Sequence, residues 1–372
     1  MYFLVLFYIK ILRNPKKILL IIQRSNGDVL HSVSLISAIY EFYNSPQIDL
    51  LVNDDTLQMA KLMPFIDSIH TFSYKKKEEG RWLQEKELIT KLIKGFDLSI
   101  NLTSSDRSVI YALLFGRKSI SVVEKEHSKS WWKKKLLTKY YFYDNAEHIV
   151  HQNLIPLEIL DIKRDYVQKP IIISKKIKNN IIRKLKDHGI EKFIIFHPSA
   201  QYKYKIMSKS LRDKLLFQLS NLGIPIIVTG TKNKIDIGIK QELPKLKNVV
   251  DFIGETSLEE YFALSDLSLA YIGMDTLNMH IAAAQNKRIF AIFGPTNLKI
   301  WSPWSNDLRA AARNDMQFQT YSNVSIFQAN MPCVACGKEG CNNSGKSECL
   351  DNIDINKIYE EVFRWVGKNA EL

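Results

Sequence analysis

The sequence predicts an α/β protein with two parallel, doubly wound sheets. Apolar runs of strand length alternate with segments of helical periodicity along most of the chain. This alternation stops in a polar, charge-rich stretch at 161–187 and then starts again. At 372 residues, the chain is also longer than a single hydrophobic core usually grows, so two domains are expected.

The first half of the chain predicts four strands with helices between them. A continuous apolar run at 18–22 indicates the first strand, and helical periodicity follows until Pro46. The predicted elements, in chain order, are a strand at 18–22, a helix at 29–43, a strand at 48–52, a helix at 56–63, a strand at 66–72, a helix at 83–94 and a strand at 96–101.

The second half repeats this order. Ser257 and Glu260 have the spacing of a capping box, which predicts that a helix begins there. The predicted elements are a strand at 193–198, a helix at 211–222, strands at 224–229 and 249–253, the helix opened by Ser257, strands at 267–272 and 289–293, and a closing helix at 354–366.

These patterns divide the chain into four parts. Residues 1–165 form an N-terminal domain with an apolar and basic extension, and residues 166–190 form a linker. Residues 191–352 form a C-terminal domain that contains a cysteine cluster, and residues 353–372 form the closing helix. Hydrophobic residues make up 46% of the chain and charged residues 24%, which is typical of globular domains.

The N-terminal segment at 1–12 is apolar apart from Lys10, and Arg13, Lys16 and Lys17 follow it. It is shorter than the roughly 20 apolar residues that cross a bilayer. It also lacks the charged leader and the cleavage site of a secretory signal. We expect either an interfacial anchor with its basic flank on the cytoplasmic face, or a helix packed on the protein.

The net charge of +13 favours an anionic partner: nucleic acid, an acidic membrane or a phosphorylated substrate. The stretch at 125–139 is rich in lysine and is interleaved with two tryptophans. That pattern suits a membrane interface or a lipid headgroup, and it suits an ordinary solvated basic surface equally well. The candidate contact residues are Lys129, Trp131, Trp132, Lys133 and Lys134.

Polar turns follow two of the predicted strands. Asp28 lies between the first strand and a helix, while Asp275 and Thr276 open a small-residue helix that carries His280. The carboxyl edge of a parallel sheet is where ligands bind, and helix N-termini attract phosphates. The same residue types also cap helices, and a histidine in this place can equally be a buried structural group.

With these turns, the chain resembles glycosyltransferase family 9, the lipopolysaccharide heptosyltransferases. The resemblance rests on Gly-Asp-Val-Leu-His at 27–31, on the segment at 271–284 and on Phe-Gly-Pro-Thr at 293–296, and it extends from Ile18 to Trp365. It implies the GT-B architecture, in which two Rossmann-like domains face a central cleft.

The resemblance also implies roles for individual residues. Asp28 would be the general base that deprotonates the acceptor hydroxyl. Lys205, with Lys203 as its competitor, would neutralise the departing diphosphate. Leu277 and Met207 stand where the family usually has Gly and Trp, and 232–236 holds no clear match for a family glutamate. The residues expected to bind the donor are Ser199, Thr229, Gly230, Asp275, Thr276, His280, Gly294, Pro295 and Thr296.

All four cysteines occur close together, in the pattern Cys-x2-Cys-x4-Cys-x7-Cys. Reduced thiols, a structural zinc site and disulfides are all open, and we expect them in that order for a cytosolic chain. The stretch at 332–341 resembles the tail of the heptosyltransferase III type. The cysteines are Cys333, Cys336, Cys341 and Cys349.

The expected function is inverting transfer of a heptose from ADP-heptose to the lipopolysaccharide inner core, as the third or branch heptose, with no cofactor required for catalysis. We expect a cytoplasmic enzyme at the cytoplasmic face of the inner membrane, with no nucleic-acid partner. The alternatives are a heptosyltransferase of the first or second type and a family member that transfers a hexose. In a different class, the chain would be a non-catalytic protein that binds a nucleotide sugar or nucleic acid.

Overall fold

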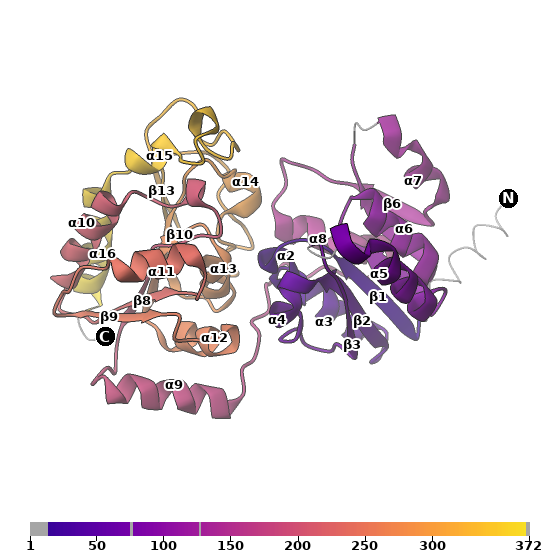
Figure 1. The fold of residues 1–372 in the computed structure, drawn as a ribbon, viewed down its shortest axis with the longest axis horizontal. Helices are drawn as coiled ribbons and strands as arrows, with labels where there is room; N and C mark the ends of the chain where they lie inside the picture. Colours follow the sequence, from indigo (N-terminus) through magenta and orange to yellow (C-terminus); the bar gives the residue numbers. More distant parts are fainter. Residues whose placement is uncertain (1–13, 75–76, 126–127, 370–372) are drawn as a thin grey trace. The chain divides into compact units, whose positions relative to one another are not determined.

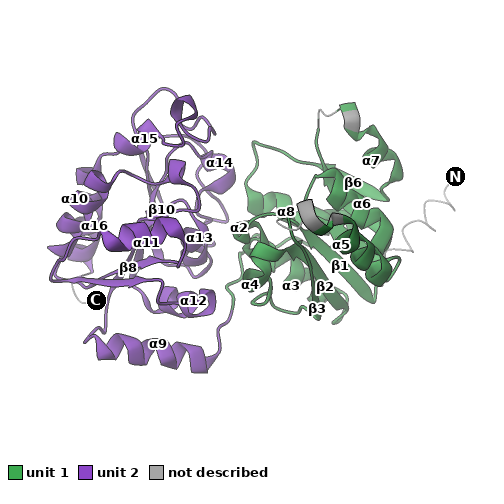
Figure 2. Ribbon diagram, in the orientation of Figure 1, with its two compact units in different colours: residues 1–171 green, residues 172–372 purple. Residues whose placement is uncertain are grey.

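The computed structural model describes residues 14–74, 77–125 and 128–369 (Figure 1). The chain divides into two compact units, residues 1–171 and residues 172–372 (Figure 2). The N-terminal segment at 1–12, with its expected anchor or packed helix, lies outside the described residues. Within the described residues, no helix is both long enough and apolar enough to span a bilayer.

A six-stranded parallel sheet forms the centre of the first unit, in the order β3-β2-β1-β4-β5-β6. Its strands are β1 (Lys17–Ile22), β2 (Gln47–Asn53), β3 (Ser68–Phe72), β4 (Phe96–Asn101), β5 (Gly116–Val123) and β6 (Lys139–Phe142). In the middle of the sheet, Leu20 pairs with Leu50 of β2 and Ile100 of β4. The strand order reverses between β1 and β4, and open sheets bind ligands at the carboxyl ends of such a switch point.

Helices cover the sheet of the first unit. They are α2 (Asn26–Leu30), α3 (Val33–Phe42), α4 (Leu57–Ala60), α5 (Lys77–Leu92), α6 (Asp106–Phe115), α7 (Trp131–Leu136) and α8 (Ile149–Ile159). Leu92 of α5 and Phe115 of α6 share one apolar cluster with Leu19 of β1, so both helices cover the same face. The helices α3 and α8 pack against each other.

The first unit differs from the prediction within the helix at 29–43, and after residue 101 it contains strands and helices that were not predicted. The helix predicted at 29–43 is divided at His31 and Ser32 into α2 and α3, and the Ser32 hydroxyl donates to the carbonyl of Val29 at 2.7 Å. The strands β5 and β6 were not predicted at all. Arg117 and Lys118 interrupt the sequence of β5, and β6 is a four-residue strand that begins at Lys139, so neither forms a long continuous apolar run.

The second unit contains a seven-stranded sheet in the order β12-β13-β11-β10-β7-β8-β9. Its strands are β7 (Ile194–His197), β8 (Ile226–Gly230), β9 (Val249–Ile253), β10 (Ala270–Met274), β11 (Arg288–Ile292), β12 (Phe318–Tyr321) and β13 (Val324–Phe327). The edge strand β12 is antiparallel to β13, which departs from the predicted parallel sheet. Only Ser322 and Asn323 connect the two strands, and a connection this short cannot join parallel strands.

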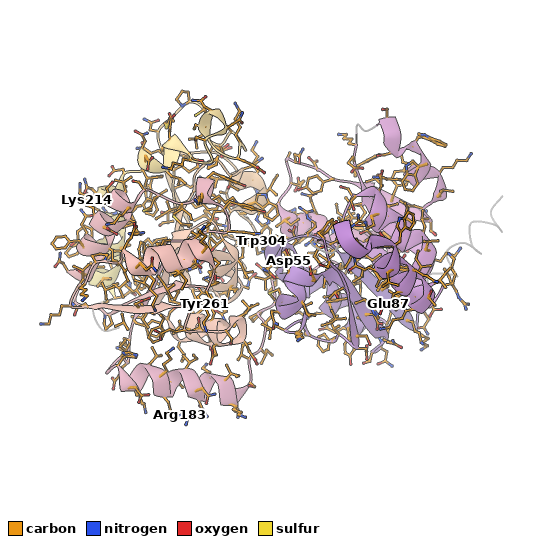
Figure 3. All side chains as sticks on the ribbon, viewed as in Figure 1. Asp55, Glu87, Arg183, Lys214, Tyr261 and Trp304 are labelled. Carbon is orange, nitrogen blue, oxygen red and sulfur yellow. The ribbon has the colours of Figure 1, made fainter. Side chains whose placement is uncertain are left out.

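The helices of the second unit are α9 (Lys175–Asp187), α10 (Lys209–Ser220), α11 (Lys234–Gln241), α12 (Leu258–Leu267), α13 (Leu277–Ala284), α14 (Leu298–Trp301), α15 (Glu348–Asp351) and α16 (Ile355–Lys368). Residues of α10, α11 and α16 share one apolar cluster with β7 and β8. The helix α12 packs against both α9 and α13. Figure 3 labels two buried aromatic residues of this unit, Tyr261 on α12 and Trp304 after α14.

The predicted capping box is present at α12. The Ser257 N–H donates to Glu260 at 2.8 Å, and the Glu260 N–H donates to the Ser257 hydroxyl at 3.2 Å. The stretch expected as a linker at 166–190, in contrast, contains the helix α9. Ile181 and Leu185 are its buried residues, one turn apart among lysines, and this single apolar stripe anchors α9 on α12 in the second unit.

Candidate active site

Asp28 is the third residue of α2, the short helix that begins after β1 at the carboxyl edge of the first sheet. Its Oδ2 accepts hydrogen bonds from the N–H of Ser25 at 3.1 Å and from the Ser25 hydroxyl at 2.7 Å, which completes a capping box at the start of α2. Its Oδ1 lies 2.9 Å from Nε of Arg24, and the side chain is 6% exposed. The carboxylate therefore stabilises its own turn, whatever further role it has.

Arg24 connects this turn to two other strands. Its guanidinium lies 5.6 Å above the ring of Tyr143, which follows β6. The Arg24 carbonyl accepts from Nδ2 of Asn53, the last residue of β2, at 3.3 Å. Burial disfavours the charged guanidinium, but Asp28 and Tyr143 outweigh this effect and raise the pKa of Arg24. Sequence reasoning did not identify Arg24, because no local pattern brings Tyr143 and Asn53 to it.

The residues of the lysine- and tryptophan-rich stretch at 125–139 differ in their exposure and contacts. Trp131 is 66% exposed, whereas Trp132 packs on an apolar cluster that contains Val109. Lys134 lies 5.0 Å above the ring of Phe142. The side chain of Lys129 lies outside the described ones.

Lys133 was predicted to lie on that surface, but it is buried. Only 1% of the residue is exposed, and its ammonium donates to the Ser104 carbonyl at 2.7 Å. It also pairs with Asp106 at 2.8 Å and with Glu124 at 3.0 Å. Because these partners follow β4 and β5, Lys133 fastens α7 to the carboxyl edge of the sheet and is not available to an acceptor or a lipid.

In the second unit, Lys205 reaches the carboxyl end of β10. Its ammonium lies 2.8 Å from Oδ2 of Asp275, whose side chain is 7% exposed. Burial opposes the charge of Lys205, but the Asp275 carboxylate prevails and the pKa of Lys205 is raised. Lys203, in the same short turn, is exposed. The geometry therefore distinguishes two lysines that the sequence left in competition.

Thr276 caps α13 directly after Asp275. Its hydroxyl oxygen accepts from the N–H of Asn278 at 3.2 Å and lies 3.4 Å from the Tyr271 hydroxyl. His280 is buried one turn later, with its ring edge-on to Trp301 at 6.5 Å between centroids. The amides in the first turn of α13 and the Lys205 ammonium therefore lie at the same strand end. Both groups favour a phosphate.

His197, at the end of β7, contacts a residue of β8 and a residue of α13. Its Nδ1 lies 3.0 Å from Thr229 Oγ1 and 3.0 Å from Asn278 Nδ2. Gly273 of β10 is its neighbour, and a side chain there would come within 2.4 Å of the His197 carbonyl. Burial lowers the pKa of His197 to about 4, against an opposing effect of the Asp236 charge, so the imidazole is neutral at pH 7. Sequence reasoning did not identify His197 as a site residue.

Replacing His197 with Gln is expected to reduce the loss of stability in acid. The unfolded histidine binds a proton near pH 6.5 and the folded one only near pH 4, so stability is lost as the pH falls between these values. Between pH 7.5 and pH 5, the free energy of unfolding should fall by about 2 kcal/mol more in the wild type than in the variant. Urea unfolding at both pH values measures this, with exposed His188→Gln as control; an equal loss in wild type and His197→Gln would contradict the prediction.

Asp236 organises the turn that follows β8. Its carboxylate accepts from the hydroxyl of Ser199 and from the N–H and hydroxyl of Thr231. A side chain at Gly230 would lie 3.2 Å from Asp236, so a glycine leaves room for this packing. The hydroxyl of Ser199, an expected donor contact, therefore has an internal partner, and Asp236 holds the two turns together.

The Gly-Pro-Thr turn after β11 packs on the cysteine segment. A side chain at Gly294 would lie 2.9 Å from Leu350 of α15, and the Pro295 carbonyl accepts from the N–H of Gly337 at 2.7 Å. Thr296 is partly exposed beside them. This turn shapes the end of the strand and presents no side chain that ionises.

The four cysteines are free thiols that line one small cavity together with Pro295. Burial first, and then the three neighbouring thiols, raise the pKa of Cys349 to about 11. Across the described part of the chain, no group of three or more His, Cys, Asp or Glu side chains is arranged to hold a metal ion. The structure thus gives no support to the alternative of a structural zinc site.

Comparisons with known proteins agree on one family. The family model described as glycosyltransferase family 9 (heptosyltransferase) matches residues 86–329. The chain is 26% identical over 296 residues to lipopolysaccharide heptosyltransferase 3 of Escherichia coli K12, covering 77% of this chain and 85% of that protein.

Two solved structures are also similar. The ADP-heptose lipopolysaccharide heptosyltransferase II of E. coli has a TM-score of 0.69 at 18% identity, covering 95% of this chain and 99% of that one. A glycosyltransferase family 9 protein of Veillonella parvula has a TM-score of 0.71 at 16% identity, covering 96% and 97%. These likenesses confirm the predicted fold class, an α/β protein of the GT-B architecture with two parallel-sheet domains.

Proposed function

Because this chain belongs to glycosyltransferase family 9 and is a glycosyltransferase, we propose that it transfers a heptose from ADP-heptose to the inner core of lipopolysaccharide. The observation that carries the proposal is the group formed by Lys205, Asp275 and Thr276 at the carboxyl edge of the second sheet. It combines a fixed ammonium with the amides of a helix N-terminus, which is suited to a diphosphate.

The second unit holds the donor in this proposal. The diphosphate lies over the first turn of α13, with Lys205 as its counter-charge and Thr276 and His280 beside it. Ser199, Thr229, Gly230 and the turn at 294–296 form the surrounding strand ends. The charge that builds on the departing diphosphate then meets a preorganised cation, so this step needs no metal ion.

The first unit presents the acceptor. Asp28 takes the proton of the acceptor hydroxyl as its oxygen attacks the anomeric carbon, and ADP leaves from the opposite side with inversion. The hydroxyl becomes acidic only as the new bond forms, so a carboxylate is a sufficient base. The acceptor is the phosphorylated inner core, and the third heptose is the one added, as the name of the E. coli K12 relative suggests.

We place the enzyme in the cytoplasm, at the surface of the inner membrane. Three residues of α7 support this place because their side chains are exposed: Trp131, Lys135 and Leu136. Exposed aromatic and aliphatic side chains next to ammonium groups suit anionic headgroups. On the same helix, Lys134 lies over the ring of Phe142, and Trp132 packs on an apolar cluster of the first unit.

The proposed function is tested by incubating the purified protein in EDTA with ADP-heptose and defined, truncated cores. Transfer is expected to a core that already carries two heptoses, and EDTA should leave the rate unchanged. In a second arm, the lipid-linked acceptor in anionic vesicles should be used more slowly by Trp131→Ser, while the delipidated core should not. Donor binding without transfer to any core would refute the proposal.

Within the family, two other assignments compete with the third heptose. An enzyme of the first or second heptosyltransferase type would prefer a core carrying fewer heptoses, and a hexosyltransferase would use another nucleotide sugar. The same panel of truncated cores, repeated with hexose donors, separates them by the acceptor and donor that support turnover.

A further inference from the structure

Arg24 has binding capacity that its protein contacts do not use. A guanidinium carries five N–H donors, and here Nε pairs with Asp28 while the guanidinium lies over the ring of Tyr143. Among the residues that the structure describes, no other side chain pairs with it. The side chain is 25% exposed at the carboxyl edge, so the remaining donors can reach a ligand.

The position of the guanidinium is fixed in advance. Asn53 holds the Arg24 backbone from β2, and Tyr143 lies under the guanidinium from the end of β6. A planar, preorganised guanidinium binds carboxylates and phosphates through paired hydrogen bonds, which a lysine cannot do.

Proton transfer to Asp28 creates a charge imbalance in this turn. Before reaction, the carboxylate and the guanidinium neutralise each other at 2.9 Å. When Asp28 accepts the acceptor's proton it becomes neutral, and Arg24 stays charged in a largely enclosed place. An unpaired charge there is unfavourable unless a second anion is present. The acceptor is the reactant that can supply that anion.

We propose that Arg24 binds an anionic substituent of the acceptor sugar, a carboxylate or a phosphate, and so frees Asp28 to accept the proton of the attacking hydroxyl. This inference rests on the proposed function, because it requires Asp28 to be the base. The anion replaces Asp28 as the partner of Arg24, so the enzyme selects anionic acceptors in the reaction step as well as in binding.

The test compares three forms of the acceptor with the full-length protein: untreated, treated with phosphatase, and with its carboxylates reduced to alcohols. The wild type should lose about 10- to 100-fold in kcat/KM on one of the two neutralised forms, which identifies the anion. Arg24→Met should be impaired on the untreated acceptor and should discriminate less than about 3-fold between the forms. Arg117→Met, which removes one exposed charge near the start of β5, should behave as the wild type.

Two further variants make every outcome decisive. Arg24→Lys keeps the charge but loses the planar donor group, so its discrimination should fall between those of the wild type and Arg24→Met; it decides the matter if Arg24→Met does not fold. Full discrimination in the Arg24 variants, or none in the wild type, overturns the role of Arg24. Activity in Asp28→Asn would instead overturn the base assignment, and no transfer by the wild type to any core would overturn the proposed function.

Discussion

Asp28→Asn is expected to lower kcat for heptose transfer by about 100- to 10,000-fold, the range lost when a general base is removed. The amide oxygen of Asn can still accept from the N–H and hydroxyl of Ser25, so the turn before α2 should persist. The variant loses the ability to take a proton and the negative charge that pairs with Arg24. Initial rates with ADP-heptose and the two-heptose core measure the effect, and circular dichroism checks the fold.

The matched control for Asp28 is Ser25→Ala. It removes the hydroxyl of the capping box and leaves the carboxylate, so it should cost about 1 kcal/mol of stability with most of the activity retained. If Asp28→Asn transfers at a near-normal rate, Asp28 is only a structural residue. If Ser25→Ala is as inactive as Asp28→Asn, the turn and not the base is what the reaction requires.

Lys205→Met is expected to lower kcat by about 100- to 1,000-fold, because the charge on the departing diphosphate loses its fixed counter-charge. Lys203→Met is the matched control: this exposed lysine lies two residues away in the same turn, and its loss should change kcat little. Rates at saturating donor measure both variants. A larger loss in Lys203→Met would exchange the roles of the two lysines.

The Lys205 variant also leaves the buried Asp275 carboxylate without its partner, which destabilises the protein. The double variant Lys205→Met with Asp275→Asn removes this unpaired charge. It should recover the thermal midpoint while transfer stays low, which separates the effect on stability from the effect on the reaction. Recovery of transfer together with stability would show that Lys205 only neutralises Asp275.

The sequence predicted elements well where one strand or helix has its own pattern. The apolar runs of β1, β2 and β4 and the Ser257 capping box are local signals, and each occurs where it was expected. Prediction was poorer where a strand or helix depends on its contacts with a neighbouring element. The short strand β6 contains Lys139 and depends on β5 beside it, and α9 depends on two apolar residues that dock on α12.

Some residues of the candidate site also have a local sequence signal, and others depend on partners far away in the chain. Asp28, Asp275 and Thr276 could be identified from sequence because each lies where a helix begins shortly after a strand, so the chain itself places them at a sheet edge. His197 and Arg24 could not, because their importance lies in partners from other strands.

By itself, the sequence determined the two-sheet α/β fold, the family, and the strand ends that carry Asp28 and Asp275, because periodicity and turn chemistry act over a few neighbouring residues. Only the tertiary structure decided which side chain of each candidate set is buried with partners and which reaches the sheet edge. It buried Lys133 among Ser104, Asp106 and Glu124, and it brought Lys205 rather than Lys203 to Asp275. These contacts join segments that are far apart in the chain. The sequence alone does not show whether a charged side chain will pair with another residue or be exposed to solvent.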